Sequence, residues 1–258
     1  MKLIYEVKDK IAHITINRPE VMNAMDPEVY SLLSEAWIDV RDNPDIWVAV
    51  ITGAGEKSFS AGMDLKASAS GPPPEKASFF MTQKGMILNR GLEVWKPIIA
   101  AVNGYCLAGG MTLLFATDIR IAAEHAVFEI SEVKRGILPG NGGTQRALKQ
   151  LPYAIAMEML LMAKRLTAQE ALSYGLINKV VPMEDLLSTA DEYAQKLCEH
   201  GPLALRAIKE LAVRSQSLPL EAGLRLESSF QSFLGTTEDA REGPRAFAEK
   251  RKPEYRGR

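Results

Sequence analysis

The sequence predicts an α/β fold, and two patterns lead to this prediction. Apolar runs of strand length recur between amphipathic helical segments through the first half of the chain. Glycine-containing loops follow several of these runs, as at the strand ends of many α/β proteins. The 258 residues, 47% of them hydrophobic and 24% charged, suffice for one substantial core or for one core with a small appended unit.

The amino-terminal segments predict a hairpin, a helix and a strand in that order. Residues 3–7 and 11–16 alternate in polarity around a short polar connection. A helix follows, with Asp26 as its N-cap and Pro27 at its first position. Residues 47–52 form a continuous apolar run typical of a strand buried on both faces. The apolar positions that share one helix face are Val29, Leu32, Leu33, Ala36, Trp37 and Val40.

The central segments repeat strands and glycine loops. A glycine-containing loop covers residues 52–66, and residues 66–83 are polar and irregular, typical of a flap or a solvent loop. A helical pattern then runs from about 79 to 94. Strands are expected at 97–102, 118–123 and 126–130, and a further glycine loop follows the last of them. We expect the glycine loops to meet at one pocket.

The second half, from about residue 144, is predicted to be mostly helical. Thr167 and Glu170 have capping-box spacing, and a short strand is expected at 177–181. Further helices are expected at 186–197, 202–215 and 219–234, with a last one from about 238. Candidate acid/base clusters are absent here, so these helices are expected to serve packing or subunit contacts. The basic tail fits a solvated end or a phosphate contact.

Composition argues against several classes of protein. A net charge of −1 gives no support to a nucleic-acid partner. Cys106 and Cys198 form no metal-binding or disulfide motif, and the three histidines lack ligand spacing. Neither a signal-peptide pattern nor an apolar run of membrane-spanning length occurs. We therefore expect a cytoplasmic protein with no membrane partner and no metal site.

The stretch NGYCLAGGMTLL, residues 103–114, is the first candidate for chemistry. Ala108, Gly109 and Gly110 stand where an apolar strand-like run gives way to a helix-like run. Glycines let backbone approach a ligand closely, and the first amides of a helix lack internal partners. Such a junction can bind an oxygen that bears negative charge. A tight turn with no ligand is the alternative.

Seven segments spread over nearly the whole chain carry a further signal. In order, they are INRPEVMNAM (16–25), FSAGMDLK (59–66), KPIIAAVNGYCLAGG (96–110), DIRIAA (118–123), GILPGNGGTQR (136–146), LTAQEALSYGLINKVV (166–181) and AFAEKRKPEY (246–255). Together they resemble the crotonase superfamily, also called the enoyl-CoA hydratase/isomerase family. The resemblance implies a spiral of ββα repeats followed by a helical carboxy-terminal region through which trimers form, often paired as hexamers.

The resemblance implies an acyl-CoA substrate and no prosthetic group. The backbone amides of Met63 and Gly109 match the pair that holds the thioester carbonyl. Glu132 matches one of two glutamates of the family's hydratases, while Thr112 stands at the position of the other. A threonine hydroxyl cannot act as a general base near neutral pH, so a single-glutamate enzyme is implied, with Glu132 as the acid/base.

Other residues of the site match the family's positions less closely. Glu129 is a reserve candidate for the acid/base, Gly140 matches a backbone position near the reacting atoms, and Asn141 is read as a turn residue. The resemblance divides the chain into a core with the acyl-CoA site, 1–195, and a helical region for oligomerisation and CoA contacts, 196–258. The matched CoA-binding positions are Met22, Ala24, Ala61, Asp64 and Leu65, with Phe247 and Lys250 frequently contributed by a neighbouring subunit.

Several functions fit this sequence. The leading one is hydration, dehydration or double-bond isomerisation of an enoyl-CoA through a thioester enolate. Thioester hydrolysis, decarboxylation or ring chemistry would reuse the same carbonyl site with other pocket side chains. A non-catalytic acyl-CoA-binding protein is the third reading, since Thr112 replaces a catalytic carboxylate.

Overall fold

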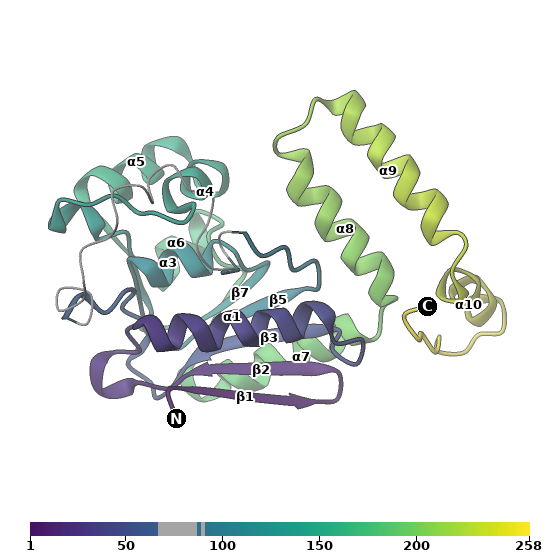
Figure 1. The fold of residues 1–258 in the computed structure, drawn as a ribbon, viewed down its shortest axis with the longest axis horizontal. Coiled ribbons are helices and arrows are strands. Elements are labelled where there is room, and N and C mark those ends of the chain that lie inside the picture. The colour runs from purple at the N-terminus through teal and green to yellow at the C-terminus, as the bar shows by residue number, and fades with distance from the viewer. Residues whose placement is uncertain (67–86, 89–90) are drawn as a thin grey trace.

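Two sheets organise the computed structural model, which describes residues 1–66, 87–88 and 91–258 (Figure 1). The larger sheet contains, in spatial order, β1 (Leu3–Lys8), β2 (Ile11–Ile16), β3 (Val48–Gly53), β5 (Ile98–Val102), β7 (Ile119–Ala123) and β10 (Lys179–Val181). The smaller sheet contains β4 (Ser58–Ser60), β6 (Tyr105–Leu107), β8 (Val127–Glu129) and β9 (Arg165–Thr167). The predicted α/β class is therefore confirmed.

Successive turns of the chain build both sheets at once. The pairs β3–β4, β5–β6 and β7–β8 each place one strand in the larger sheet and the next in the smaller one. These strands pair in parallel within each sheet, whereas β1–β2 and β8–β9 pair antiparallel. Helix α3 (Gly109–Leu114) follows β6, which completes a ββα turn. This repetition is the expected spiral.

Helices cover the larger sheet on both faces. Helix α1 (Pro27–Asp42) begins as predicted, because the Asp26 carboxylate accepts a hydrogen bond from the Val29 amide at 2.9 Å. Its buried face packs into the main core. Helix α7 (Leu186–Cys198) packs against β3, β5 and β7 from the other side. The continuous apolar strands are thus explained by burial on two faces.

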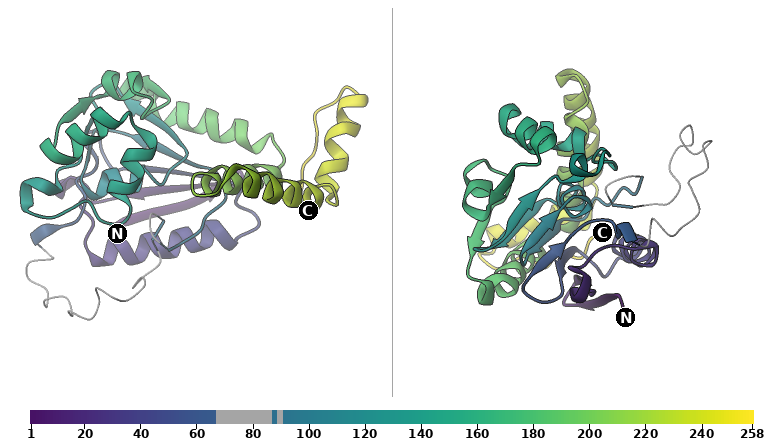
Figure 2. Two further views of the ribbon diagram at one scale, coloured as in Figure 1. Left: turned by 90° about the horizontal axis from the view of Figure 1, so that it is seen from above. Right: turned by 90° about the vertical axis from the view of Figure 1, so that its left-hand side faces the viewer.

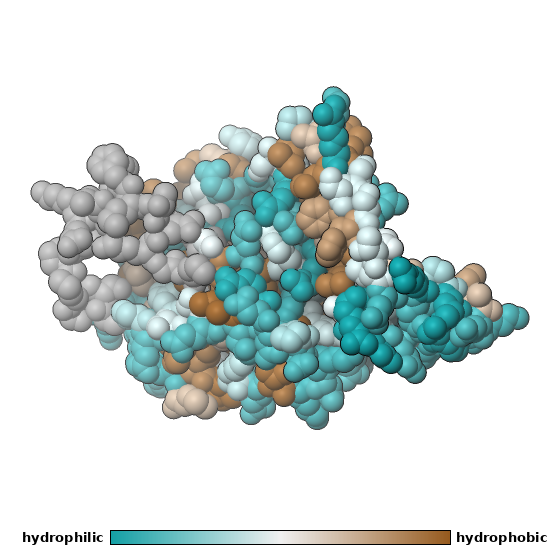
Figure 3. All heavy atoms as spheres, turned by 45° about the vertical axis from the view of Figure 1, so that its right-hand side comes forward, coloured by the Kyte–Doolittle hydropathy of each residue, from teal (hydrophilic) through white to brown (hydrophobic). Residues whose placement is uncertain are grey.

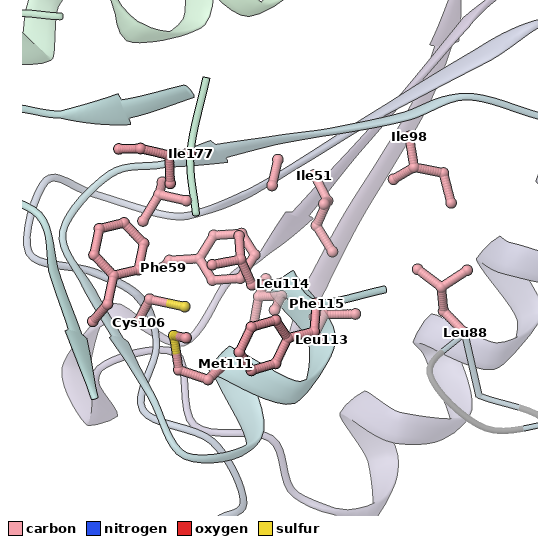
Figure 4. Close-up of a cluster of buried hydrophobic side chains, with 14 of the residues drawn as sticks. Ile51, Phe59, Leu88, Ile98, Cys106, Met111, Leu113, Leu114, Phe115 and Ile177 are labelled. Carbon is pink, nitrogen blue, oxygen red and sulfur yellow. The ribbon is translucent and has the colours of Figure 1, made fainter. Parts of the chain in front are cut away.

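The main core lies where the two sheets meet α3. Phe59 of β4 and Cys106 of β6 are fully buried, and both lie beside Met111 of α3 (Figure 4). Leu114 packs in the same cluster. These contacts fix the position of α3 relative to the smaller sheet, so the core sets the orientation of the helix start.

Three short strands were not expected. β4, β6 and β9 have three residues each, too short for a polarity pattern to appear. The predicted irregular segment 66–83 lies almost wholly outside the described residues, and so does most of the predicted helix 79–94. Residues 91–94, which are described, are not helical, so that end of the prediction is wrong.

The second half is helical, as predicted. The capping box of Thr167 and Glu170 is present at the start of α6. Helices α8, α9 and α10 extend away from the sheets (Figures 1 and 2). The boundary near residue 195 stays a prediction. The elements are η1 (Pro19–Val21), η3 (Glu132–Arg135), α4 (Gly143–Gln150), α5 (Tyr153–Met162), α6 (Ala168–Ser173), η4 (Met183–Asp185), α8 (Pro202–Ser215), α9 (Leu220–Leu234) and α10 (Glu238–Ala248).

Two further observations concern the described residues. The carboxy-terminal tail folds back on α10, where Asp239 accepts hydrogen bonds from the amides of Arg256 and Gly257 at 2.7 and 2.8 Å. Among the helices described, none combines the length and the apolar character that crossing a membrane requires.

Replacing Phe59 by alanine should lower the free energy of unfolding by about 3–5 kcal/mol, because the deletion opens a cavity in the cluster that holds α3. Chemical denaturation measures the change. Tyr153→Ala is the control: its side chain is 71% exposed, and its loss should change stability by less than about 0.5 kcal/mol. Equal effects of the two substitutions would contradict this account of the core.

Candidate active site

Three loops that follow strands of the smaller sheet converge on one cavity of about 490 Å³. The segment after β4 supplies Ala61, Met63 and Leu65 to its wall. The start of α3 contributes Gly109 and Thr112. The loop after β8 adds Glu132 and Gly140. The predicted convergence of the glycine loops is therefore confirmed.

The backbone amides of Met63 and Gly109, which border this cavity, have no acceptor among the described residues. Met63 forms a parallel bridge with Met25, and both hydrogen bonds of the bridge use the neighbours of Met63: Met25 donates to the Gly62 carbonyl and accepts from the Asp64 amide. The Met63 amide therefore points to the other side of its strand. The Gly109 amide is the first of α3 and lacks an intrahelical acceptor.

Close contact between glycines brings these amides together. A Cβ built on Gly62, where φ is +87°, would lie 2.5 Å from the Gly109 nitrogen. A Cβ built on Gly109 would lie 3.2 Å from the Met63 nitrogen. One on Gly110 would meet the Ser60 carbonyl oxygen at 2.4 Å. Side chains at Gly62 and Gly110 would therefore force the two segments apart.

The turn into α3 holds a strained residue. Ala108 has φ 47° and ψ −116°, a conformation that residues with a side chain seldom adopt. Its amide donates to the Glu129 carbonyl at 2.9 Å, which fixes the turn against β8. The direction of the Gly109 amide is thus set by the turn at Ala108, which its hydrogen bond to β8 holds in place.

Glu132 is the first residue of η3 and is only 8% exposed. Its Oε2 atom has no hydrogen-bond partner among the residues that the structure describes. Burial, and secondarily the negative charge of Glu129, raises the pKa of Glu132 above the ordinary glutamate value. A carboxylate in this setting accepts a proton more readily than one on the surface.

Glu129, three residues earlier, is in a different state. Its carboxylate is 2% exposed and lies 2.5 Å from both the Lys134 ammonium and the Arg165 guanidinium. Burial pushes its pKa up, but the hydrogen bonds to these two cations outweigh burial and lower the pKa overall. Glu129 is therefore a fixed anion, and its two oxygens are occupied.

Thr112 lies in the cavity wall, as expected. Its hydroxyl donates to the Gly109 carbonyl one turn earlier, at 2.9 Å. This bond ties the side chain to the first turn of α3.

Gly140 and Asn141 also line the cavity, and Asn141 has φ 53°, the left-handed conformation typical of a turn residue.

The predicted CoA-binding positions form two groups. Ala61 and Leu65 line the cavity, while Met22, Ala24 and Asp64 lie next to it in hydrogen-bonded backbone. The Ala61 amide donates to the Met22 carbonyl at 3.0 Å. Arg18 joins the segments, donating to the Ala24 carbonyl at 2.6 Å and to Asp64 at 3.0 Å.

Phe247 and Lys250 lie apart from the cavity. Phe247 is on α10 and 87% exposed, Lys250 follows that helix, and α10 lies at the opposite end of the molecule from α3 (Figure 1). Within one chain these two residues do not join the site.

Sequence reasoning missed Tyr30 as a site residue. It projects from the first turn of α1 and lines the cavity together with Gly109 and Glu132. Tyr30 is neither one of the apolar positions that predict the buried helix face nor part of a motif. Only the folded arrangement brings α1 beside the loop that holds Glu132.

A larger groove lies elsewhere. It has a volume of about 1040 Å³ and lies between α8 and the main body, with Trp95, Arg120 and Lys209 in its wall. Neither Glu132 nor the two acceptor-free amides line it. Among the described residues, no group of three or more His, Cys, Asp or Glu side chains is arranged to hold a metal ion.

Comparison with known proteins gives consistent results. The family model for enoyl-CoA hydratase/isomerase matches residues 6–258. The chain is 44% identical over 257 residues to (E)-benzylidenesuccinyl-CoA hydratase of Thauera aromatica, with complete coverage of both chains. It is also 44% identical over 253 residues to carnitinyl-CoA dehydratase of Salmonella enteritidis, covering 96% of this chain and 95% of that one.

Solved structures agree. The crystal structure of an enoyl-CoA hydratase from Mycobacterium tuberculosis superimposes with a TM-score of 0.91 at 37% identity, covering 100% of this chain and 99% of that chain. One from Bacillus anthracis gives 0.91 at 33% identity with complete coverage of both. Family match, relatives and fold together establish that this chain is an enzyme of the enoyl-CoA hydratase/isomerase family, within the crotonase superfamily.

Proposed function

We propose that this enzyme stabilises the enolate of an acyl-CoA thioester between the Met63 and Gly109 amides and moves protons with Glu132 alone. One observation supports this proposal most: two amides without acceptors and a buried carboxylate oxygen without a partner border the same cavity. Such groups normally find partners inside a protein. A thioester carbonyl and a reacting proton would supply them.

The two amides fit the charge that forms in this chemistry. Removing a proton beside a thioester, or adding water to an enoyl thioester, moves negative charge onto the carbonyl oxygen. Fixed donors aimed at that oxygen stabilise the transition state, and removal of one comparable donor costs about 3 kcal/mol. Because both donors are backbone groups, changing the Met63 side chain alone should leave the amide in place.

The two glutamates differ in their fitness as a base. The carboxylate of Glu129 is held by Lys134 and Arg165, whereas Oε2 of Glu132 has no partner. The raised pKa of Glu132 brings it nearer to working pH, which favours proton transfer in both directions. We therefore assign Glu132 as the acid/base, and Glu129 remains an ionised carboxylate beside it.

The reaction is the addition or removal of water across an enoyl-CoA double bond, or the shift of that bond. Both reactions place negative charge on the thioester carbonyl oxygen as an enolate, and each can proceed with one carboxylate. Two relatives are named a hydratase and a dehydratase, which supports water chemistry. Thr112 distinguishes this enzyme from hydratases with two glutamates, so double-bond isomerisation is the second candidate.

Binding of the CoA portion is proposed for the backbone of Met22, Ala24, Ala61, Asp64 and Leu65, in a cytoplasmic enzyme. We further propose that Phe247 and Lys250 reach the CoA nucleotide from a neighbouring chain of a trimer or hexamer. Apolar side chains along the α8–α9 hairpin support such an assembly (Figure 3). The most exposed of them are Ile208, Leu220, Leu224 and Phe233.

Replacing Glu132 by glutamine should abolish turnover of 2-enoyl-CoA and 3-enoyl-CoA, lowering kcat at least about 10³-fold, because the amide cannot accept a proton. Spectrophotometric assays of both substrates measure the effect. Glu129→Gln is the matched control and should retain more activity. Undiminished turnover in the Glu132 variant would remove it from this role.

The same variant should fold at least as well as the parent. Since the pKa of Glu132 is raised in the folded state, its ionisation above that pKa opposes folding. We expect the Gln variant to gain up to about 1 kcal/mol at neutral pH.

In the parent, kcat/KM should fall as pH decreases through the raised pKa. An acid limb centred below 4.5, the ordinary glutamate value, would contradict this assignment.

Replacing Gly62 by alanine should lower kcat/KM at least about 10²-fold, because the new Cβ pushes the Met63 and Gly109 amides out of alignment. Steady-state kinetics on an enoyl-CoA measure it. Gly223→Ala is the control, since nothing lies within 4 Å of a Cβ there. A Gly62 variant with parental kinetics would show that the glycine contact is not needed.

Light scattering of the purified protein should give three or six times the mass of one chain. Replacing Leu224, 52% exposed on α9, by glutamate should shift the mass toward one chain if this hairpin lies in the interface. Leu220→Glu, at the start of the same helix, provides a second test. A monomeric parent protein would refute the assembly.

A further inference from the structure

The phenol of Tyr30 faces both parts of the proposed reaction site. It lines the cavity that holds Glu132 and the Gly109 amide. It also borders a small apolar recess lined by Leu33, Trp37 and Leu113. Tyr30 therefore lines both the reacting centre and an apolar space, and its side chain carries a hydroxyl.

The start of α1 holds Tyr30 in place. The Tyr30 amide donates to the Asp26 carbonyl at 3.0 Å, and the Asp26 carboxylate caps the helix. Lys2 anchors that carboxylate at 2.6 Å. The ring packs against the main core. A side chain fixed at both its backbone and its ring can present a hydroxyl at a constant position.

Tyr30 stays a neutral donor under working conditions. Burial, and secondarily the negative charge of Glu132, raises the pKa of the phenol to about 12. Tyr30 and Glu132 line the same cavity. A phenol that keeps its proton can donate one hydrogen bond to an oxygen atom and accept another.

Water addition needs such a donor. The attacking water must lose a proton to Glu132 while its oxygen points at the β-carbon of the enoyl group, so a second group must orient it. Thr112 is one group in the wall, but its hydroxyl proton is given to the Gly109 carbonyl. The hydroxyl of Tyr30 makes no hydrogen bond to another described residue that would compete with a water.

We propose that the Tyr30 hydroxyl is a catalytic hydrogen-bond donor that holds the reacting water, or the departing hydroxyl group in the reverse reaction, opposite Glu132. This role rests on the proposed function. In the forward direction the water oxygen bonds to the β-carbon as Glu132 takes a water proton. The π electrons move toward the thioester carbonyl, and the α-carbon then receives a proton from Glu132. Tyr30 keeps its own proton throughout.

This role separates two reactions of one site. Hydration of a 2-enoyl-CoA needs the oriented water, whereas exchange of the α-hydrogens of a saturated acyl-CoA with D₂O needs only Glu132 and the two amides. Tyr30→Phe removes the hydroxyl and keeps the ring. We therefore expect the variant to lose about 10- to 100-fold in kcat for hydration of crotonyl-CoA. Deuterium exchange into butanoyl-CoA should stay within about 3-fold of the parent rate.

The experiment measures both rates on the full-length parent, Tyr30→Phe, and Tyr153→Phe as the matched control on the exposed surface of α5. Selective loss of hydration supports the role. Parental hydration in Tyr30→Phe, or an equal fall of both rates, overturns it. Exchange without hydration in the parent also overturns the role of Tyr30, but it agrees with the roles proposed for Glu132 and the two amides. A parent with neither activity refutes the proposed function and this role with it.

Discussion

The contact between Gly62 and Gly109 is the constraint on which the candidate site depends. Two segments 47 positions apart in the numbering approach so closely that a Cβ on Gly62 would lie 2.5 Å from the Gly109 nitrogen. The rest of the fold holds these two segments together. Phe59, Cys106 and Met111 pack behind it, and parallel pairing of β4 with β6 aligns the two loops. The Met63 and Gly109 amides are consequently backbone donors held in place by core packing and strand pairing, which suits a site that must not reorganise during reaction.

Around these amides the chain places two carboxylates in opposite states. Glu129 lies between two cations and remains ionised, and Glu132 is buried with one free oxygen. The fixed charge of one raises the pKa of the other, although burial is the larger cause. An arrangement with a single mobile proton is chemically sufficient for enolate chemistry. The reacting water still has to be oriented, and Tyr30, Thr112 and Ser131 are the described hydroxyl-bearing side chains that line the cavity.

Much of this fold could be predicted from the sequence, because long segments with a regular polarity pattern can be assigned as helices or strands. The Asp26 cap, the buried strand after α1 and the capping box of Thr167 all follow from local chemistry. Strands of three residues carry no such pattern, and β4, β6 and β9 exist only because neighbouring strands pair with them. The site shows the same division. The family resemblance located Met63, Gly109 and Glu132, whereas Tyr30 belongs to no motif, and only tertiary packing brings it to the cavity.

The central claim is that one carbonyl oxygen accepts from both backbone amides while Glu132 faces the adjacent carbon. A crystal structure with a bound, unreactive acyl-CoA tests this most directly. The account predicts that the thioester oxygen lies about 2.7–3.1 Å from both the Met63 and the Gly109 nitrogens, with a Glu132 oxygen beside the α- and β-carbons. A thioester bound with its carbonyl away from these amides, or with Glu132 turned from the acyl chain, would contradict it.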